Sequence, residues 1–331
     1  MAGRRRKKSG GRSYAWRYRG RIVACVFVEV IIICALVIMI GWNKGVKEWF
    51  EQFEQPVLKE VDISGINSPN AILMQARGGK ILGEINGEAQ IYPASMTKIM
   101  TVILGIENFD DLDEKITLTN EMFSGLYEQD ATQAGFQPGE EVRVIDLLYG
   151  AMLPSGAECC IALADTISGS EADFAELMNK KAGKLGMENT HFCDSTGLHN
   201  PDHYSTVKDI AVLMKYCIKN DTFREIVETS RHSTGVTNIH PDGITYYSTM
   251  FKNLSDPTVT GGKILGGKTG YTSEAGHCLV SFAEIEGREY IFVSAGASGA
   301  DGNTIPHIQD AVTVYNRVGA AIEAKMNNNN K

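Results

Sequence analysis

The chain has 331 residues, of which 43% are hydrophobic and 22% are charged, a composition typical of a folded protein with a sizeable core. Its formal net charge is −8, yet residues 1–21 carry nine Lys or Arg and no acid, so the rest of the chain is strongly acidic. A folded domain of that charge argues against nucleic acid as a partner.

An apolar segment follows the basic N-terminus. Residues 22–40 contain a single charged residue, Glu29, and a helix of that length spans roughly 29 Å, enough to cross the hydrocarbon core of a membrane. The basic flank predicts that the N-terminus stays in the cytoplasm and that the rest of the chain lies outside the cell. A cleavable signal peptide is the alternative, but its apolar region usually has about 7–15 residues and ends in a small-residue cleavage site. We therefore expect single-pass anchoring in the cell membrane.

The sequence divides by composition into five parts. We expect residues 1–21 to form a cytoplasmic basic tail, 22–41 a transmembrane helix, 42–67 a stalk and 68–324 the folded domain. Residues 325–331 include four consecutive Asn. We expect this tail to be disordered, because so polar a segment buries too little apolar surface to offset the entropy lost on ordering.

Strand patterns lie at both ends of the folded domain, and helical patterns fill its middle. Gly78-Gly79 joins the first two strands as a tight turn, and Glu286-Gly287 joins the last two. Ser170 and Thr206 are each followed three residues later by an acid, which is typical of a helix start. The predicted strands are 71–77, 80–85, 277–284 and 289–295, and the predicted helices are 95–106, the run from the Pro138-Gly139 turn to Leu153, 157–167, the segments that begin at Ser170 and Thr206, and 305–324. This order indicates an α+β domain whose sheet is assembled from both ends of the chain.

The cysteines indicate neither a disulfide framework nor a zinc site. Five of the seven lie beyond the apolar segment, and their odd number and spacing match neither pattern. The adjacent Cys159 and Cys160 are expected to pack as small hydrophobic residues in a helix. The sequence contains neither H-E-x-x-H nor C-x-x-C, so we expect no metal and no other cofactor.

Ser95-Met96-Thr97-Lys98 is the first of three segments that could carry chemistry. A serine hydroxyl is a poor nucleophile until a base takes its proton, and residues i and i+3 of a helix lie on one face. A lysine amine can act as that base only where burial or nearby positive charge lowers its pKa. Alone the tetrapeptide is weak evidence, because a serine at a helix start is more often a cap.

The other two segments are Ser155-Gly156-Ala157 and Lys268-Thr269-Gly270. Lys268 and Thr269 could bind a substrate carboxylate by charge and hydrogen bonds, and Gly270 would let a strand edge approach a ligand closely. The alternatives are an ordinary loop serine and an ordinary turn.

The order of the three segments is that of class A β-lactamases and penicillin-binding proteins, which carry S-x-x-K, then S-D-N, then K-T-G. Sixty residues separate Ser95 from Ser155, and 113 separate Ser155 from Lys268. In this context the chain resembles the low-molecular-mass penicillin-binding proteins that act as D-alanyl-D-alanine carboxypeptidases. The matching stretches are 68–74, 91–101, 147–156, 190–192, 196–198, 203–206 and 267–272.

This resemblance implies a β-lactamase/transpeptidase-like fold, with a five-stranded antiparallel sheet flanked by helices and a helical lobe beside it. It also implies a serine hydrolase whose substrate is a peptidoglycan stem peptide ending in D-Ala-D-Ala, and which β-lactams acylate. By position, Ser95 would attack the penultimate D-Ala carbonyl, Lys98 would take its proton, and Ser155 would relay protons to the leaving amine.

The K-T-G segment would bind the substrate. The resemblance implies that Lys268 and Thr269 hold the terminal carboxylate, beside Gly270, and that the backbone N–H groups of Ser95 and Tyr271 form the oxyanion hole.

The sequence departs from the family pattern in two places. The second motif usually ends in an Asn that contacts the lysine and the substrate amide, and this chain has Ala157. Glu158 is next in sequence, but on a helix it would point about 100° away. The family often has an Arg shortly before the last helix; residues 299–307 contain none, and His307 is the candidate substitute.

Two alternatives stay open at this point. With Ala157 in the second motif, the domain could be a weakly active or silent binder of muropeptides with a regulatory role, since a fold does not fix a function. A class A β-lactamase would need a Glu about 35 residues after the second motif. Glu188 stands at that distance, but its surroundings match the carboxypeptidase pattern.

Overall fold

The computed structural model describes residues 58–254, 256–299 and 305–329. These residues belong to one compact unit that begins at about residue 57. The predicted basic tail and transmembrane helix lie outside the described residues. None of the helices in the described part is both long and apolar enough to cross a membrane.

A six-stranded antiparallel sheet forms the centre of the unit, with the strand order β2-β1-β10-β9-β8-β7. Its strands are β1 (Asn70–Gln75), β2 (Ile81–Ile85), β7 (Thr258–Val259), β8 (Gly262–Thr272), β9 (Gly276–Ile285) and β10 (Arg288–Ala297). The expected number was five. The additional strand is β7, two residues that pair back onto the start of β8 across a turn in which Gly261 has a φ of +74°.

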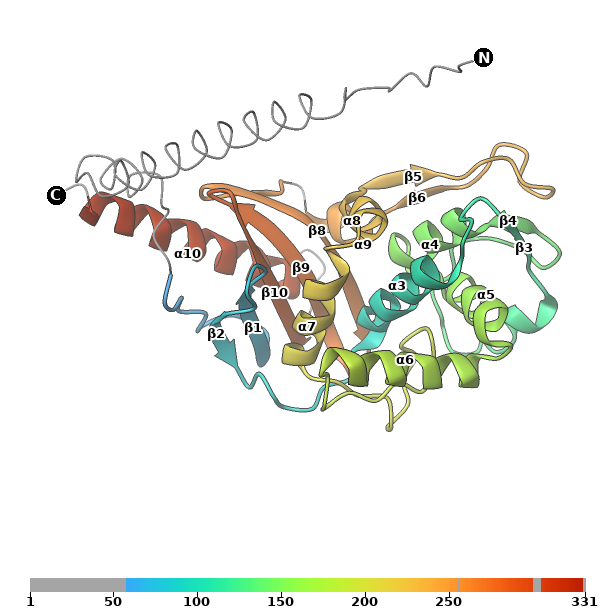
Figure 1. Cartoon of the computed structure of the whole chain (residues 1–331), viewed down its shortest axis with the longest axis horizontal. Coiled ribbons are helices and arrows are strands. Elements are labelled where there is room, and N and C mark those ends of the chain that lie inside the picture. The colour runs from blue at the N-terminus through green and yellow to red at the C-terminus, as the bar shows by residue number, and fades with distance from the viewer. Residues whose placement is uncertain (1–57, 255, 300–304, 330–331) are drawn as a thin grey trace, which may run out of the picture. The chain divides into compact units, whose positions relative to one another are not determined.

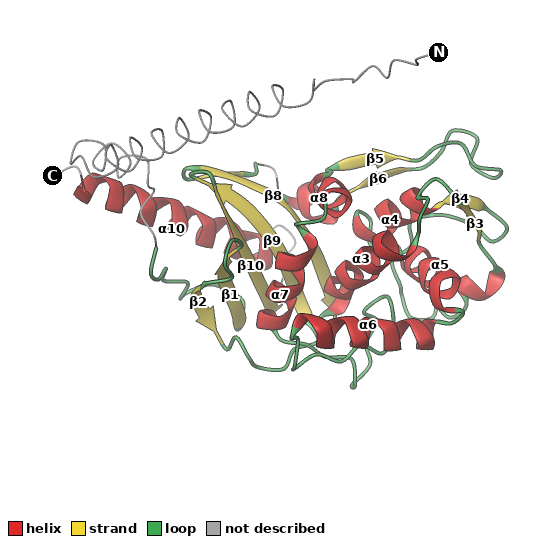
Figure 2. Cartoon of the chain, in the orientation of Figure 1, coloured by secondary structure: helices red, strands yellow, loops and turns green. Residues whose placement is uncertain are grey.

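The sheet is buried on both faces, as the alternation in β1 shows. Successive side chains of a strand point to opposite faces, and Leu73 packs in one hydrophobic core while Ile72 and Met74 pack in the other. The first core lies under α10 (Pro306–Asn329), which runs along the sheet, and the second lies under helices of the middle of the chain (Figures 1 and 2).

The middle of the chain forms both the helices that cover the second face of the sheet and the helical lobe beside it. It contains a one-turn 3-10 helix (Ala94–Thr97), α3 (Lys98–Asn108), a second 3-10 turn (Asn120–Phe123), α4 (Val144–Met152), α5 (Ala157–Ser168), α6 (Glu171–Leu185), α7 (Val207–Cys217), α8 (Asp221–Glu228) and α9 (Thr249–Asn253), with the small strand pairs β3 (Lys115–Thr117)–β4 (Glu141–Arg143) and β5 (Arg231–Ser233)–β6 (Thr245–Tyr247). The predicted helix starts are confirmed, because Ser170 Oγ accepts the N–H of Asp173 and Thr206 Oγ1 accepts the N–H of Asp209.

Three predicted boundaries are wrong. Residues 141–143 form β4 and not the start of a helix, because they pair with β3. Residues 58–67 are not a stalk: Leu58, Val61 and Ile63 are buried in the core under α10. The helix α10 continues to Asn329, so the tail is not disordered from residue 325. Strong helix formers such as Ala324 and Lys325 carry the helix into the Asn run.

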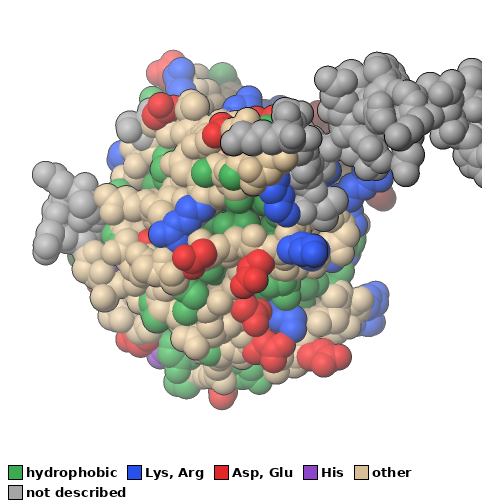
Figure 3. Space-filling view, turned by 90° about the vertical axis from the view of Figure 1, so that its left-hand side faces the viewer, with side chains coloured by type: hydrophobic (Ala, Val, Ile, Leu, Met, Phe, Trp, Pro, Cys, Tyr) green, Lys and Arg blue, Asp and Glu red, His purple; other side chains and the backbone are tan. Residues whose placement is uncertain are grey.

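Figure 3 shows the side of the unit that lies at the left in Figure 1. The described side chains on this side include acidic and basic groups with hydrophobic groups between them.

Candidate active site

Ser95 and Lys98 meet at the start of α3. Ser95 lies in the 3-10 turn and Lys98 is the first residue of the helix. Lys98 Nζ lies 3.1 Å from Ser95 Oγ, within hydrogen-bond distance. The Lys98 side chain is only 3% exposed, so water competes little for its amine. The tight turn thus places a nucleophile and a base in contact, which is the arrangement that activates a serine.

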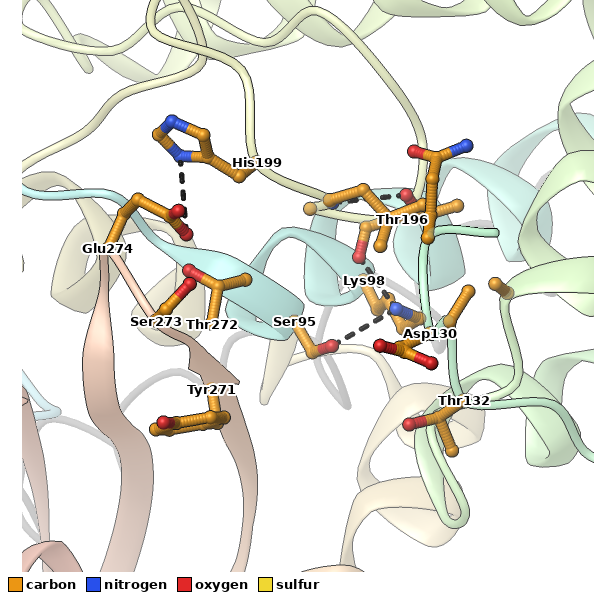
Figure 4. Close-up of a pocket in the computed structure, with 15 residues that line it drawn as sticks. Ser95, Lys98, Asp130, Thr132, Thr196, His199, Tyr271, Thr272, Ser273 and Glu274 are labelled. Atoms are coloured by element: carbon orange, nitrogen blue, oxygen red, sulfur yellow. Dashed lines mark hydrogen bonds and ion pairs between the residues drawn. The ribbon is translucent and has the colours of Figure 1, made fainter. Parts of the chain in front are cut away.

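A second contact fixes the other side of the lysine amine. Lys98 Nζ donates a hydrogen bond of 2.6 Å to the backbone carbonyl of Thr196 (Figure 4). Thr196 lies in a loop between α6 and α7 and is almost 100 residues away in sequence.

The K-T-G segment lies on β8. Lys268 is 1% exposed, and its Nζ donates to Ser155 Oγ at 3.0 Å and to its neighbour's carbonyl, Thr269 O, at 2.7 Å. Burial and the nearby charge of Lys98 hold the pKa of Lys268 well below its usual range. The Thr269 hydroxyl lies 2.6 Å from that of Thr249.

Gly270 allows β8 to pass directly beside the nucleophile. A Cβ at this position would lie 2.9 Å from the backbone nitrogen of Ser95, a distance that real side chains essentially never show, and 3.3 Å from that of Met96. The next residue, Tyr271, is 61% exposed. The glycine therefore brings the strand edge against the start of α3.

A pocket of about 420 Å³ opens over Ser95 and Lys98. Figure 4 shows the two side chains between β8, which carries Tyr271, and the loop that carries Asp130 and Thr132. Other lining residues are Gln129, Ala131, Ala157, Thr196, Gly197, Leu198, His199, Thr272, Ser273 and Glu274. A hollow of this size holds part of a peptide or a small molecule.

Comparison with known proteins gives one family. Residues 57–299 match the D-alanyl-D-alanine carboxypeptidase family, peptidase S11. The chain belongs to this family. It is 35% identical over 231 residues to the D-alanyl-D-alanine carboxypeptidase DacF of Bacillus subtilis, with 69% of this chain and 57% of that protein covered. It is also 35% identical to the D-alanyl-D-alanine carboxypeptidase of Streptomyces sp. strain K15, with 69% and 78% covered.

Solved structures agree on the fold. The crystal structure of the Streptomyces K15 DD-transpeptidase superposes with a TM-score of 0.71 at 30% identity, covering 79% of this chain and all of that one. The fold is therefore the β-lactamase-like fold of the DD-peptidases. The chain spans just over half the length of the first curated relatives, 57% and 58%.

The second motif ends in Ala157 and not in the expected Asn. Ala157 contributes no polar group, and its N–H is bonded to Thr132 O. Ser155, whose φ is +75°, bonds to Lys268 and not to Lys98 in the described structure. Glu158 does not replace the missing Asn, because it is buried and its Oε1 accepts the N–H groups of Ala134 and Gly135.

His307 does not supply the charge of the family's Arg. It is 4% exposed and its ring stacks on that of His277 at 5.0 Å. Burial and the neighbouring His277 lower the pKa of His307 to about 4, so the ring is neutral at neutral pH. It is not among the residues that line the pocket.

The sequence reasoning missed most of the pocket wall outside the three motifs. Thr196, His199 and Glu274 line the pocket, and His199 Nδ1 lies 4.0 Å from a Glu274 carboxylate oxygen. The one signal for this wall in the sequence is the stretch 196–198, which lies among those that match the family. Glu188, the residue that a β-lactamase would need, is exposed and does not line the pocket.

Proposed function

We propose that this chain is a serine-type D-Ala-D-Ala carboxypeptidase that removes the terminal D-Ala from peptidoglycan stem peptides through an acyl-enzyme on Ser95. The observation that carries the proposal is the 3.1 Å contact between Ser95 Oγ and the buried Lys98 amine at the floor of the pocket. Membership of the carboxypeptidase family supports it.

The first half of the reaction forms the acyl-enzyme. Ser95 Oγ attacks the carbonyl carbon of the penultimate D-Ala while its proton passes to Lys98 Nζ. The tetrahedral intermediate collapses, the amide C–N bond breaks, and the departing D-Ala amine takes the proton that Lys98 accepted, which leaves the Lys98 amine neutral. In the free protein Ser155 bonds to Lys268, so a proton relay through Ser155 requires this hydroxyl to turn toward Lys98 when substrate binds.

Water completes the cycle by attacking the ester carbon of the acyl-enzyme. A proton passes from the water to the neutral Lys98 amine and then to Ser95 as the ester bond breaks, which restores the starting state.

The strand β8 would hold the substrate. Lys268 and Thr269 would bind the terminal carboxylate, and the N–H groups of Ser95 and Tyr271 would stabilise the oxyanion. Removing one oxyanion donor typically costs about 2.7–4 kcal/mol of transition-state stabilisation. The close approach at Gly270 is what makes a two-donor site on β8 and the 3-10 turn before α3 feasible.

A silent or weakly active muropeptide binder is the second candidate, because Ala157 leaves Lys98 without the usual side-chain amide. The test combines a fluorescent penicillin with a D-Ala-D-Ala pentapeptide. Covalent labelling together with D-Ala release supports the carboxypeptidase, and labelling without release supports the binder. Rapid hydrolysis of the penicillin would support a β-lactamase.

Two variants make this test specific. Ser95→Ala should abolish both labelling and release, while Ser168→Ala, at the end of α5 and away from the pocket, should leave both unchanged. A wild-type protein that folds but takes no label would contradict the role of Ser95.

We also propose that residues 22–41 anchor the chain in the cell membrane, with the N-terminus in the cytoplasm and the folded unit outside. The apolar length and the basic flank support this orientation. Protease added to intact cells should digest the folded unit and spare an N-terminal epitope tag. Protection of the folded unit would contradict the orientation.

A further inference from the structure

The lysine base is held by a carbonyl and not by a side chain. In the described structure, the hydrogen bonds of Lys98 Nζ go to Ser95 Oγ and Thr196 O. To act as the base, Lys98 must present a lone pair and keep two N–H groups, and donating one of these N–H groups to Thr196 O restricts rotation about the Cε–Nζ bond. The position of that carbonyl therefore decides whether the lone pair faces the serine hydroxyl.

The carbonyl belongs to a turn built around Asp194. Its Oδ1 accepts the N–H of Thr196 at 2.7 Å, the hydroxyl of Thr196 at 2.8 Å and the N–H of Gly197 at 2.6 Å. Burial opposes the charge, but His203 and these groups outweigh it and lower the pKa of Asp194 to about 2. The carboxylate is thus ionised at neutral pH and folds the turn around itself.

His203 connects this carboxylate to the helix that carries the nucleophile. Its Nδ1 lies 3.0 Å from Asp194 Oδ2, and its Nε2 lies 2.8 Å from Thr97 Oγ1. His203 is 2% exposed and Thr97 is fully buried. The backbone N–H of Cys193 also points at His203 Nδ1, at 3.2 Å, so the ring is held at both nitrogens.

The turn also lies directly against Ala94, the residue before the nucleophile. Gly197 has a φ of +80°, and a Cβ there would lie 1.9 Å from the carbonyl oxygen of Ala94. Thr101 adds a 2.6 Å hydrogen bond from α3 to Ser195 O. Turn and helix start are therefore tied together on both sides of Lys98.

We propose that Asp194, His203 and Thr97 form a clamp that positions the Thr196 carbonyl against Lys98, so that the lysine is aimed at Ser95 without the side-chain amide that Ala157 lacks. The three are positioning residues, since none of them lines the pocket. The inference deepens the proposed function and rests on it for the reaction that is measured.

The test uses the full chain and a matched pair of substitutions at Thr97. Thr97→Val keeps the shape and removes the hydroxyl, whereas Thr97→Ser keeps the hydroxyl. Thr166→Val is the control, because the Thr166 hydroxyl bonds only within α5, to Ala162 O. The acylation rate constant at saturating fluorescent penicillin is measured by rapid mixing. Non-covalent penicillin affinity is measured separately with each substitution combined with Ser95→Ala.

We expect Thr97→Val to slow acylation about tenfold, since it leaves a buried histidine nitrogen without its partner. The acylation rate constant of Thr97→Ser should stay within about threefold of the wild-type value, and that of Thr166→Val should equal the wild-type value. Asp194→Asn should be slower than Thr97→Val, because it also weakens the turn. Non-covalent affinity should be unchanged in every variant.

Equal acylation by the Val and Ser variants would overturn the clamp, and so would a loss carried entirely by affinity. If Asp194→Asn does not fold, the Thr97 pair decides alone. A wild-type protein that takes no label contradicts the proposed function instead. The clamp is then judged by the Lys98 side-chain ¹⁵N resonance, which should move in Thr97→Val and not in Thr97→Ser.

Discussion

Asp194 should contribute to the stability of the fold as well as to the geometry of the site. Its pKa of about 2 in the folded protein compares with 3.8 for an unperturbed Asp. Since one factor of ten in proton affinity is worth about 1.4 kcal/mol, the difference corresponds to about 2.4 kcal/mol of folding free energy at pH 7. The side chain is 19% exposed, so solvent screening reduces this figure only modestly.

The sign of the pH dependence follows from the lowered pKa. A carboxyl that binds its proton more weakly in the folded state stabilises that state above pH 3.8, and this contribution fades as the pH falls toward 2. About 1.3 kcal/mol of it should remain near pH 3. Asp194→Asn resembles the protonated carboxyl in size and has no charge at any pH, so it should lose about 2 kcal/mol at pH 7 and clearly less at pH 3.

Urea unfolding of the wild type and the variant at both pH values measures the two differences. Asp165→Asn is the matched control, because burial raises the pKa of Asp165; its substitution should leave stability at pH 7 unchanged or slightly increased. A loss at Asp194 that is the same at pH 3 and pH 7 would refute the electrostatic reasoning, and would show that the asparagine disturbs packing instead.

Three further predictions concern β8 and the thiols. Gly270→Ala should slow acylation by penicillin at least tenfold while the protein stays folded by circular dichroism, because the added methyl pushes the strand away from Ser95 N; an unaffected rate would contradict this. Lys268→Met should abolish D-Ala release yet resist urea better than wild type at pH 7, since it removes a buried amine whose pKa burial lowers. The difference in free energy of unfolding between variant and wild type should narrow as the pH rises toward 10.5. A variant that is less stable than wild type at pH 7 would contradict this reasoning. A thiol reagent mapped by mass spectrometry should modify Cys193 before the four buried cysteines of the folded unit, which are Cys159, Cys160, Cys217 and Cys278. Modification of the buried cysteines first would contradict this and would show that the core opens.

The elements that the sequence predicted well are those with a local cause. Ser170 and Thr206 cap their helices through contacts three residues away, and the Glu286-Gly287 turn adopts positive φ at both residues. Such signals lie within a few positions of each other, so a single sequence displays them.

The wrong predictions have causes that are distant in sequence. Residues 58–67 read as a stalk because they are mixed in composition, yet Asn67 and Ser68 are bound by the Asp310 carboxylate of α10. The strand β4 exists only because β3 is beside it. Tertiary contacts decided both segments, and no local pattern reports them.

The same distinction applies to the site. The three motifs are short and ordered, and the structure brings their segments into contact with one another, although only Ser95, Lys98 and Ala157 of them line the pocket. The contacts of Ser155 are different from those expected, and the loop of Thr196 was not assigned a role, because 98 residues separate this threonine from the lysine that it binds. The order of the three motifs and their matching context predicted the Ser95–Lys98 pair, but they contained no information about what holds the pair in place.

This difference changes how the missing Asn at Ala157 should be weighed. If one side-chain amide fixed the lysine, its loss would leave the amine free to rotate. In this structure the lysine is fixed by a backbone carbonyl, and the turn that presents this carbonyl is folded by an ionised, mostly buried Asp194. A backbone acceptor held from several directions has less freedom than a single side chain on a helix end. A substitution at position 157 therefore changes the pocket wall and the contacts to substrate more than it changes the orientation of the Lys98 amine toward Ser95.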